Sequence, residues 1–488
     1  MEKKQRTLVV VSLLVVVLSV SVAYFTAQII GQGKDISVTS ANLQVIFTDT
    51  DGEITATDIE PGWTSTKSFT VKNSTKTEYK YNIVLKDLVN TFITTGYLQY
   101  KITSTNNGYN MTDFEDIPKS VTATDEILAY SVSIPTGVTQ SYTIEFKYTN
   151  DENANQSEDM GKTLSGTLFI TEGSYKTITY ADGTLGKQLL SDKTTRPGER
   201  KDFSTTLTTD NTKTLYTGNE DNTTVYYFAG NATDNWVKFG KNSSEEDLYW
   251  RIIRTNADGG IRLLYHGTST TAEDAYINNS TTFNNSYTNL KYVGYMYDSN
   301  GTNSTIKNTI DSWYESNLKL YYGKYLSTTA VYCNDRTSDG TNFGARIRLY
   351  TNKTPTYDCA NTEDKFTVSS ITGNGKLTYP IALMTADEIS FAGGLWANDA
   401  PAYYFKNSVG VSSTGSTYWY TMSPYGWIGS ASGVFRVSGS DHSGRLLNVW
   451  VNYTNGVARP AISLKSCTQY GTGDGSADNP YTIDESGC

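Results

Sequence analysis

Residues 418–464 read YWYTMSPYGWIGSASGVFRVSGSDHSGRLLNVWVNYTNGVARPAISL, the most informative stretch of the chain. Two alternating apolar runs, Val434–Val437 and Leu447–Val451, flank the polar turn Ser438–Arg445. Six Gly and three Trp are spread among Ser, Asn, Tyr and Thr. This pattern predicts short β-strands joined by tight turns. Aromatic and Arg side chains beside small polar residues are typical of a recognition surface rather than of a catalytic centre.

Several side chains of this stretch are candidates for binding a ligand. Trp419 and Phe435 are expected to face the core. The aromatic candidates lie in or beside Gly-rich turns, where exposure is expected, although packing in the core is an equal alternative for them. The candidate ligand-binding residues are Tyr425, Trp427, Arg436, Asp441, His442, Trp450 and Tyr453.

The same stretch contains polar residues with other possible roles. Asp441, Asn448 and Asn452 carry the oxygen atoms that Ca²⁺ takes as ligands. Asn and Asp serve turns and strand faces so readily that we predict no metal site there. Arg459 precedes Pro460 and is predicted to form a structural ion pair, because Arg suits partly buried pairing.

No group of residues in the sequence predicts catalysis. Thr385–Phe391 predicts a helical turn with Thr385 as N-cap. Asp387 and Glu388 are adjacent on it, so they point apart and are expected to make cap and solvent contacts. His442 lies near Asp441 and Ser443, but no Gly-x-Ser-x-Gly motif is present. We therefore predict a protein that is not an enzyme, with no catalytic residue and no cofactor.

Composition bounds the class of protein. The chain has 488 residues, which predicts two or three domains. Its formal net charge is −10, which argues against nucleic acid as a partner because phosphate binding needs clustered Lys and Arg. The 37 Tyr and many Thr favour half-buried strands. An acidic chain rich in Thr, Asn and Tyr is typical of extracellular β proteins.

The N-terminus has the composition of a membrane-directed segment. Three basic residues among the first six precede an apolar run from Leu8 to about Ala27, and roughly 20 such residues span a bilayer as a helix. The basic end stays in the cytoplasm, so the rest of the chain is expected outside. A signal peptide cleaved after Ala23 or Ala27 is the alternative. We favour a retained anchor over residues 1–34, because apolar residues continue to Ile30.

The four cysteines lie in the C-terminal third of the chain. Outside the cytoplasm an even number of cysteines predicts disulfides, and three pairings are possible. The simplest pairing is local, Cys333 with Cys359 and Cys467 with Cys488, because each pair encloses a short polar loop. Zinc is the competing interpretation, but the sequence contains no C-x-x-C and only two His.

Residues 35–173 show period-two alternation of apolar residues. Clear examples are Tyr79–Leu85, Tyr142–Tyr148 and Leu164–Ile170. Short alternating strands separated by turns predict a β-sandwich of antiparallel sheets. The Glu60-Pro61-Gly62 turn and the following segment 69–73 resemble camelysin-type bacterial surface and biofilm-fibre proteins, which implies a cell-surface or matrix role.

The remaining chain divides into three parts. Residues 174–200 are polar and contain Pro and Gly, which predicts a linker. Residues 201–466 predict an α+β domain with a hairpin over 249–265 and an amphipathic helix within 304–325. The tail, residues 467–488, is too polar to bury a core, and a disulfide is expected to hold it to the domain.

Six motifs follow one another in the α+β domain: Asn235–Gly240, Trp250–Ile253, Ile310–Tyr314, Leu383–Ile389, Trp419–Pro424 and Gly456–Ala461. Their order resembles the C-type-lectin-like domain of uncharacterised Gram-positive bacterial surface proteins. Ala458 stands before Arg459, where the usual ending in that family is Gly-Val-Arg-Pro. The same broad fold occurs in the variable receptors of diversity-generating retroelements, and the resemblance implies that a C-terminal segment of this kind displays the residues that bind ligand.

We therefore expect a mainly β chain made of an N-terminal membrane helix, a β-sandwich and a C-type-lectin-like α+β domain. The expected function is non-enzymatic binding or adhesion at a bacterial cell surface, with a protein or glycan ligand on another cell or host surface. The chain is expected in the cell membrane with its C-terminal bulk outside, or secreted if the N-terminal segment is cleaved. A structural surface or matrix subunit without a specific ligand is the alternative.

Overall fold

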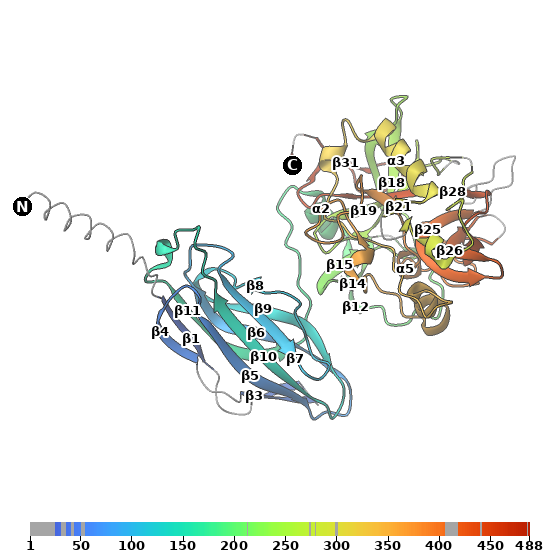
Figure 1. The fold of residues 1–488 in the computed structure, drawn as a ribbon. Coiled ribbons are helices and arrows are strands. Elements are labelled where there is room, and N and C mark those ends of the chain that lie inside the picture. Colours follow the sequence, from blue (N-terminus) through green and yellow to red (C-terminus); the bar gives the residue numbers. More distant parts are fainter. Residues whose placement is uncertain are drawn as a thin grey trace, which may run out of the picture. The chain divides into compact units, whose positions relative to one another are not determined.

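The structure is a computed structural model that describes residues 25–30, 36–40, 43–49 and 54–488, apart from 212, 273, 274, 279, 298–300, 406–417, 440, 441 and 486. Side chains are described from residue 60 onward, except at 198, 210 and 211. Strands hold 41% of the residues and helices 12%, so the predicted mainly β character is confirmed. The chain forms two compact units, unit 1 up to Lys176 and unit 2 from Thr177 to Cys488 (Figure 1).

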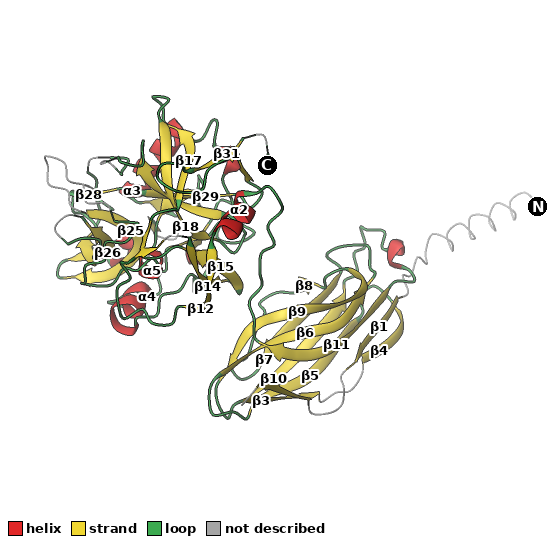
Figure 2. Ribbon diagram, turned by 180° about the vertical axis from the view of Figure 1, so that it is seen from behind, coloured by secondary structure: helices red, strands yellow, loops and turns green. Residues whose placement is uncertain are grey.

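Unit 1 contains two sheets that enclose one apolar core, the arrangement of a β-sandwich (Figure 2). The first sheet has the order β4-β1-β11-β6-β9 and the second β2-β3-β5-β10-β7-β8. The strands are β1 (Phe25–Ile30), β2 (Ile36–Ser40), β3 (Leu43–Asp49), β4 (Ile54–Ile59), β5 (Thr64–Asn73), β6 (Tyr79–Asn90), β7 (Leu98–Ser104), β8 (Glu115–Asp116), β9 (Ser120–Ile134), β10 (Thr139–Tyr148) and β11 (Thr163–Glu172).

The alternation seen in the sequence sets the buried face of these strands. On β5 and β10 every second side chain is buried, and Phe69 pairs with Tyr142 across the ladder. Their rings stack with centroids 4.9 Å apart. Cross-strand aromatic pairs of this kind stabilise one register, because a slip by one residue would move the apolar set to solvent.

The predicted membrane segment, residues 1–34, is wrong at its C-terminal end. Phe25–Ile30 forms β1, which pairs in parallel with β11 and antiparallel with β4. Apolar content alone does not separate a buried strand from a membrane helix, and the β-branched Ile29 and Ile30 favour the strand. Residues 1–24 lie outside the described part. Where the structure is described, no helix is long and apolar enough to cross a membrane.

Most of the predicted linker, residues 174–200, is instead part of unit 2, which begins at Thr177. It contains helix α2 (Leu185–Asp192), which Thr184 caps by accepting from the Lys187 backbone N–H, and strand β12 (Thr194–Glu199). Leu185 and Leu189 are fully buried in the core of the unit. Burial of these two side chains outweighs the polarity of the residues around them, which had indicated a linker.

Unit 2 is built on one large sheet and a separate four-stranded sheet. The large sheet follows the order β12-β14-β15-β18-β17-β31-β30, with β19, β29 and β24 added beside β18. The predicted hairpin is present, because β18 and β19 pair antiparallel. Its further strands are β14 (Thr214–Glu220), β15 (Thr223–Tyr227), β17 (Trp236–Lys241), β18 (Asp247–Thr255), β19 (Ile261–Gly267), β24 (Ile381–Leu383) and β29 (Pro460–Leu464).

The four-stranded sheet has the order β27-β26-β25-β28 and contains the Gly-rich stretch. The helices α3 (Thr305–Asn317) and α5 (Ala386–Phe391) belong to the same unit, as does α2. Helix α3 ends at Asn317, short of the predicted Tyr325. The chain continues through turns to a short 3₁₀ helix at Gly323–Tyr325, where Tyr325 is buried. The strands of this sheet are β25 (Tyr418–Ile428), β26 (Ala431–Ser438), β27 (Leu446–Trp450) and β28 (Gly456–Val457).

The C-terminal segment is more than a tethered tail. It forms β30 (Gln469–Tyr470) and β31 (Tyr481–Asp484), and β31 pairs in parallel with β17. The Tyr481 side chain is fully buried, so this polar stretch does contribute to the core. Both local disulfides, Cys333–Cys359 and Cys467–Cys488, are formed as predicted.

Candidate functional site

The predicted ligand-binding residues differ in their accessibility. Trp419 and Phe435 lie in the core, as predicted. Tyr425 is only 5% exposed, whereas Tyr453 is 49% exposed. The glycines of this turn had indicated that Tyr425 is exposed. They instead allow another segment of the chain to lie close by, since the Gly426 backbone forms a β-bridge with Asn342.

The register of the small sheet separates Arg436 from Trp450. Trp450 is opposite Gly433 and Leu447 is opposite Arg436. Gly433 and Arg436 are three residues apart on one strand, so their side-chain positions lie on opposite faces. Arg436 donates from Nε to the Asn448 carbonyl at 3.2 Å. The candidates therefore do not form one continuous surface.

The other candidates lie near the ends of these strands. Trp450 and Tyr453 contact each other with ring centroids 5.2 Å apart. Trp427, on β25, is half-buried. His442 is half-buried in the turn between β26 and β27, and its backbone N–H donates to Gly439. Asp441 lies outside the described residues.

Tyr425 belongs to an aromatic group that the sequence did not predict. Its ring stacks on Trp396, with centroids 5.1 Å apart and planes 15° apart. Tyr350 meets Trp396 edge-on at 5.2 Å, and the Arg346 guanidinium carbon lies 4.5 Å from the Tyr425 centroid. We call Arg346, Tyr350, Trp396 and Tyr425 the Trp396 cluster. An Arg held over aromatic rings is favourable and keeps its hydrogen-bond donors available.

The Trp396 cluster reaches the surface through a π-helical segment. Arg346 ends the short helix α4 (Gly344–Arg346), and Tyr350 lies in η4 (Ile347–Asn352), whose π-helical geometry is rare and frequent at functional sites. Tyr350 is 46% exposed and Ile347 37%. In the sequence, the i, i+4 spacing of Arg346 and Tyr350 was the feature that could have indicated that their side chains meet on one helical face.

The Trp396 cluster and Trp450 share one face of the small sheet. Phe435 contacts both Trp396 and Tyr425, at 5.9 and 5.1 Å. Phe435 is two residues from Gly433, the partner of Trp450, so both positions have the same orientation. On this face of the small sheet, the aromatic side chains lie beside the exposed segment η4.

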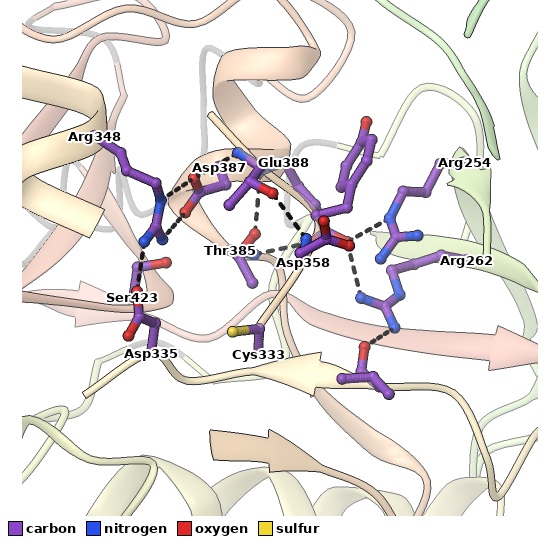
Figure 3. Close-up of a pocket in the computed structure, with 13 residues that line it drawn as sticks. Arg254, Arg262, Cys333, Asp335, Arg348, Asp358, Thr385, Asp387, Glu388 and Ser423 are labelled. Carbon is purple, nitrogen blue, oxygen red and sulfur yellow. Dashed lines mark hydrogen bonds and ion pairs between the residues drawn. The ribbon is translucent and has the colours of Figure 1, made fainter. Parts of the chain in front are cut away.

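Beneath η4 lies a buried group of charged residues, the arginine–carboxylate cluster (Figure 3). Figure 3 shows Arg348 between Asp387 and Asp335. The Arg348 guanidinium donates to both Asp387 carboxylate oxygens at 3.0 Å. The other members are Glu220, Arg254, Arg262, Asp335 and Glu388.

Glu388 joins two arginines to the cap of α5. One carboxylate oxygen accepts from Arg254 at 2.9 Å and Arg262 at 2.8 Å, and the other accepts from the Thr385 backbone N–H at 2.9 Å. Burial alone would raise the pKa of Glu388, but the charges of Arg262 and Arg254 outweigh it and hold the pKa below its ordinary value. The capping box is confirmed.

The predicted solvent contacts of the two adjacent carboxylates are wrong. Asp387 and Glu388 are buried and point to different arginines. The partners come from η4, β18 and β19, which are distant in sequence, so local spacing does not reveal them. The space between these side chains is about 10 Å³, room for at most one water and none for a substrate. Among the described residues, no three His, Cys, Asp or Glu side chains are grouped to hold a metal ion.

Arg459 is buried, but the predicted ion pair is wrong. Its guanidinium donates to the backbone carbonyls of Tyr265 and Tyr404, and it lies 5.1 Å from the Trp419 ring centroid. No carboxylate within the described part of the chain forms a salt bridge with it. Carbonyl acceptors satisfy its donors because Pro460 starts β29 and places Arg459 at a strand end.

No protein-family model matches the chain, and no curated protein matches its sequence significantly.

Proposed function

We propose that this chain is a non-enzymatic binding protein of the bacterial cell surface, with a C-type-lectin-like unit 2 that recognises a protein or glycan. The segment before Phe25 would hold it in the membrane. The Trp396 cluster is the observation that carries the proposal. It places an Arg and three aromatic rings on one face, with Tyr350 exposed beside Ile347.

The composition of the cluster suits recognition. Trp, Tyr and Arg dominate the few residues that supply most binding energy at interfaces, and they act best when neighbouring groups exclude water. Tyr425 and Phe435 provide that dry base beneath Trp396. Trp450 lies on the same face and extends the candidate surface.

The segment that displays Tyr350 is fixed before any ligand arrives. Arg348 of η4 is clamped by Asp387 and Asp335. A surface that is ordered in advance loses less conformational entropy on binding. The arginine–carboxylate cluster therefore supports a positioning role: its charges are paired with one another, and the space between them admits no substrate.

Protein and glycan arrays probed with the full chain test this proposal. We expect at least one ligand whose binding falls tenfold or more in Tyr350→Ala and Arg346→Ala. Ile371→Ala is the control, because Ile371 is an exposed apolar residue outside the cluster. Silence on both arrays together with concentration-dependent polymerisation would favour a structural subunit, and turnover of a substrate would show an enzyme.

A further inference from the structure

A second candidate site lies in unit 2 at a groove of about 690 Å³. One wall is the turn between β17 and β18, and the other is the end of α3 with the residues that follow it. None of the predicted ligand-binding residues lines it. The volume is in the range of small-molecule and short-oligomer sites. Its lining includes Asn242, Glu245, Asn317, Tyr321, Tyr322 and Glu485.

Hydrogen bonds hold the two walls in place. The Ser243 backbone N–H donates to the Asn317 side chain at 2.9 Å, which joins the turn to the helix end. Asn317 also donates to the Trp313 carbonyl at 2.6 Å. Asn242 accepts from two backbone N–H groups of its own turn, those of Ser244 and Glu246. The groove is therefore a formed feature rather than a gap between loose segments.

An aromatic surface borders the groove. Tyr321 is 68% exposed and the adjacent Leu320 is 79% exposed. Tyr321 contacts Tyr322, and Tyr322 packs edge-on against Phe239 with centroids 5.6 Å apart. Tyr322 is held by Phe239 and supports the exposed ring of Tyr321. The Tyr321 ring therefore offers a flat apolar face with a polar hydroxyl at its tip.

The charge of the groove is negative. Glu245, Glu315 and Glu485 line it with one cation, Lys241, which is itself 3.4 Å from Asp247. Glu315 pairs with Lys319 at 3.1 Å, so the excess of negative charge comes from Glu245 and Glu485. Burial raises the pKa of Tyr322, and the charges of Glu485 and Glu245 raise it further. Carboxylate and amide oxygens here accept hydrogen bonds, whereas an anionic ligand would be repelled.

We propose that this groove binds an oligosaccharide without acidic groups. The C–H face of a sugar ring fits the negative face of the Tyr321 ring, while sugar hydroxyls donate to the Glu245 and Glu485 carboxylates. Amino groups on the sugar strengthen the fit because the groove is acidic. This site is separate from the Trp396 cluster and does not depend on the function proposed for it.

Titration calorimetry on the full chain tests the site, with maltotetraose, chitotetraose and the glucosamine tetramer as probes and tetragalacturonate as the acidic comparison. We expect saturable binding of at least one non-acidic tetramer and none of tetragalacturonate. Tyr321→Ala should weaken that binding at least tenfold, whereas Tyr350→Ala should leave it within twofold. Glu245→Gln should reduce the preference for the glucosamine tetramer.

Three results would overturn the proposal. They are absence of saturable binding for every non-acidic tetramer, tighter binding of tetragalacturonate, and equal binding by Tyr321→Ala and the unchanged chain. Circular dichroism of Tyr321→Ala checks its folding, which is expected to be intact because the side chain is exposed. Loss through Tyr350→Ala but not through Tyr321→Ala would assign the sugar to the Trp396 cluster instead.

Discussion

Arg348 donates from Nε and Nη2 to the two carboxylate oxygens of Asp387, each at 3.0 Å. The pair joins a π-helical surface segment to the first turn of α5, two elements that lie far apart in sequence. A bidentate Arg–carboxylate pair fixes orientation as well as distance. The exposed Tyr350 is therefore positioned by a contact on the opposite side of its own segment.

Removing this contact should destabilise unit 2 and loosen η4. Asp387→Ala leaves Arg348 without its main partner in a largely buried site, so we expect a loss of about 3 kcal/mol in the free energy of unfolding. Urea unfolding followed by tryptophan fluorescence measures it, and hydrogen exchange at 346–352 should increase. Asp399→Ala is the control, because its exposed pair with Arg445 should contribute about 1 kcal/mol or less. Equal losses in the two variants would contradict the positioning role.

Unit 2 should lose stability in acid through Glu388. Its pKa in the folded chain lies below the ordinary 4.5, so the folded state favours the charged form. The stabilisation is fully present above about pH 4.5 and disappears as pH falls through the lowered pKa of the folded chain. The free energy of unfolding, measured from pH 7 to pH 3, should therefore fall less steeply in Glu388→Gln. Glu246→Gln, at an exposed side chain of the same unit, should keep the slope of the unchanged chain.

Gly426 should not tolerate a side chain. Its φ is +151°, and a Cβ there would lie 2.6 Å from the Thr341 carbonyl oxygen. Gly426→Ala should lower the free energy of unfolding by about 3 kcal/mol, since backbone must shift and strain is added. Gly429→Ala adds strain at φ +59° without a close contact and should lower it by only about 1 kcal/mol. Thermal unfolding of both variants decides whether close approach is the cause.

The Cys333–Cys359 disulfide should stabilise the region around the arginine–carboxylate cluster. Closing a loop of 26 residues lowers the conformational entropy of the unfolded chain, which stabilises the folded state by about 3 kcal/mol. The paired change Cys333→Ser and Cys359→Ser should lower the urea midpoint and increase hydrogen exchange near Asp335. The same change at Cys467 and Cys488 should instead affect β30 and β31. Identical exchange patterns in the two variants would show a global rather than a local effect.

Local patterns predicted much of this fold. Alternation placed Phe69 and Tyr142 on the buried face, the Thr385 and Glu388 spacing predicted the cap, and short polar loops predicted both disulfides. Each of these features depends on residues close in sequence or on a simple period. The strand Phe25–Ile30 was missed because an apolar run has the same appearance in a membrane helix and in a buried strand.

The candidate surface was predicted less well, for a physical reason. Exposure of Tyr425 depends on Trp396 and on the segment around Asn342, which cover it from distant parts of the chain. Arg459 was expected to pair with a carboxylate, but its guanidinium donates to backbone carbonyls instead. Every residue has a backbone carbonyl, so the sequence does not indicate which carbonyls will accept from an arginine. Side-chain periodicity indicates which positions share a face, but it does not indicate what covers that face.

The pairing of β31 with β17 also sets the timing of folding. Val237 is opposite Tyr481 and Lys238 is opposite Thr482, so the large sheet stays incomplete until synthesis has passed Asp484. Translation at about 5–20 residues per second covers the roughly 240 residues between the end of β17 and the end of β31 in about 12 to 50 s. During that interval the edge of β17 that later pairs with β31 is free, and unit 2 cannot reach its final form.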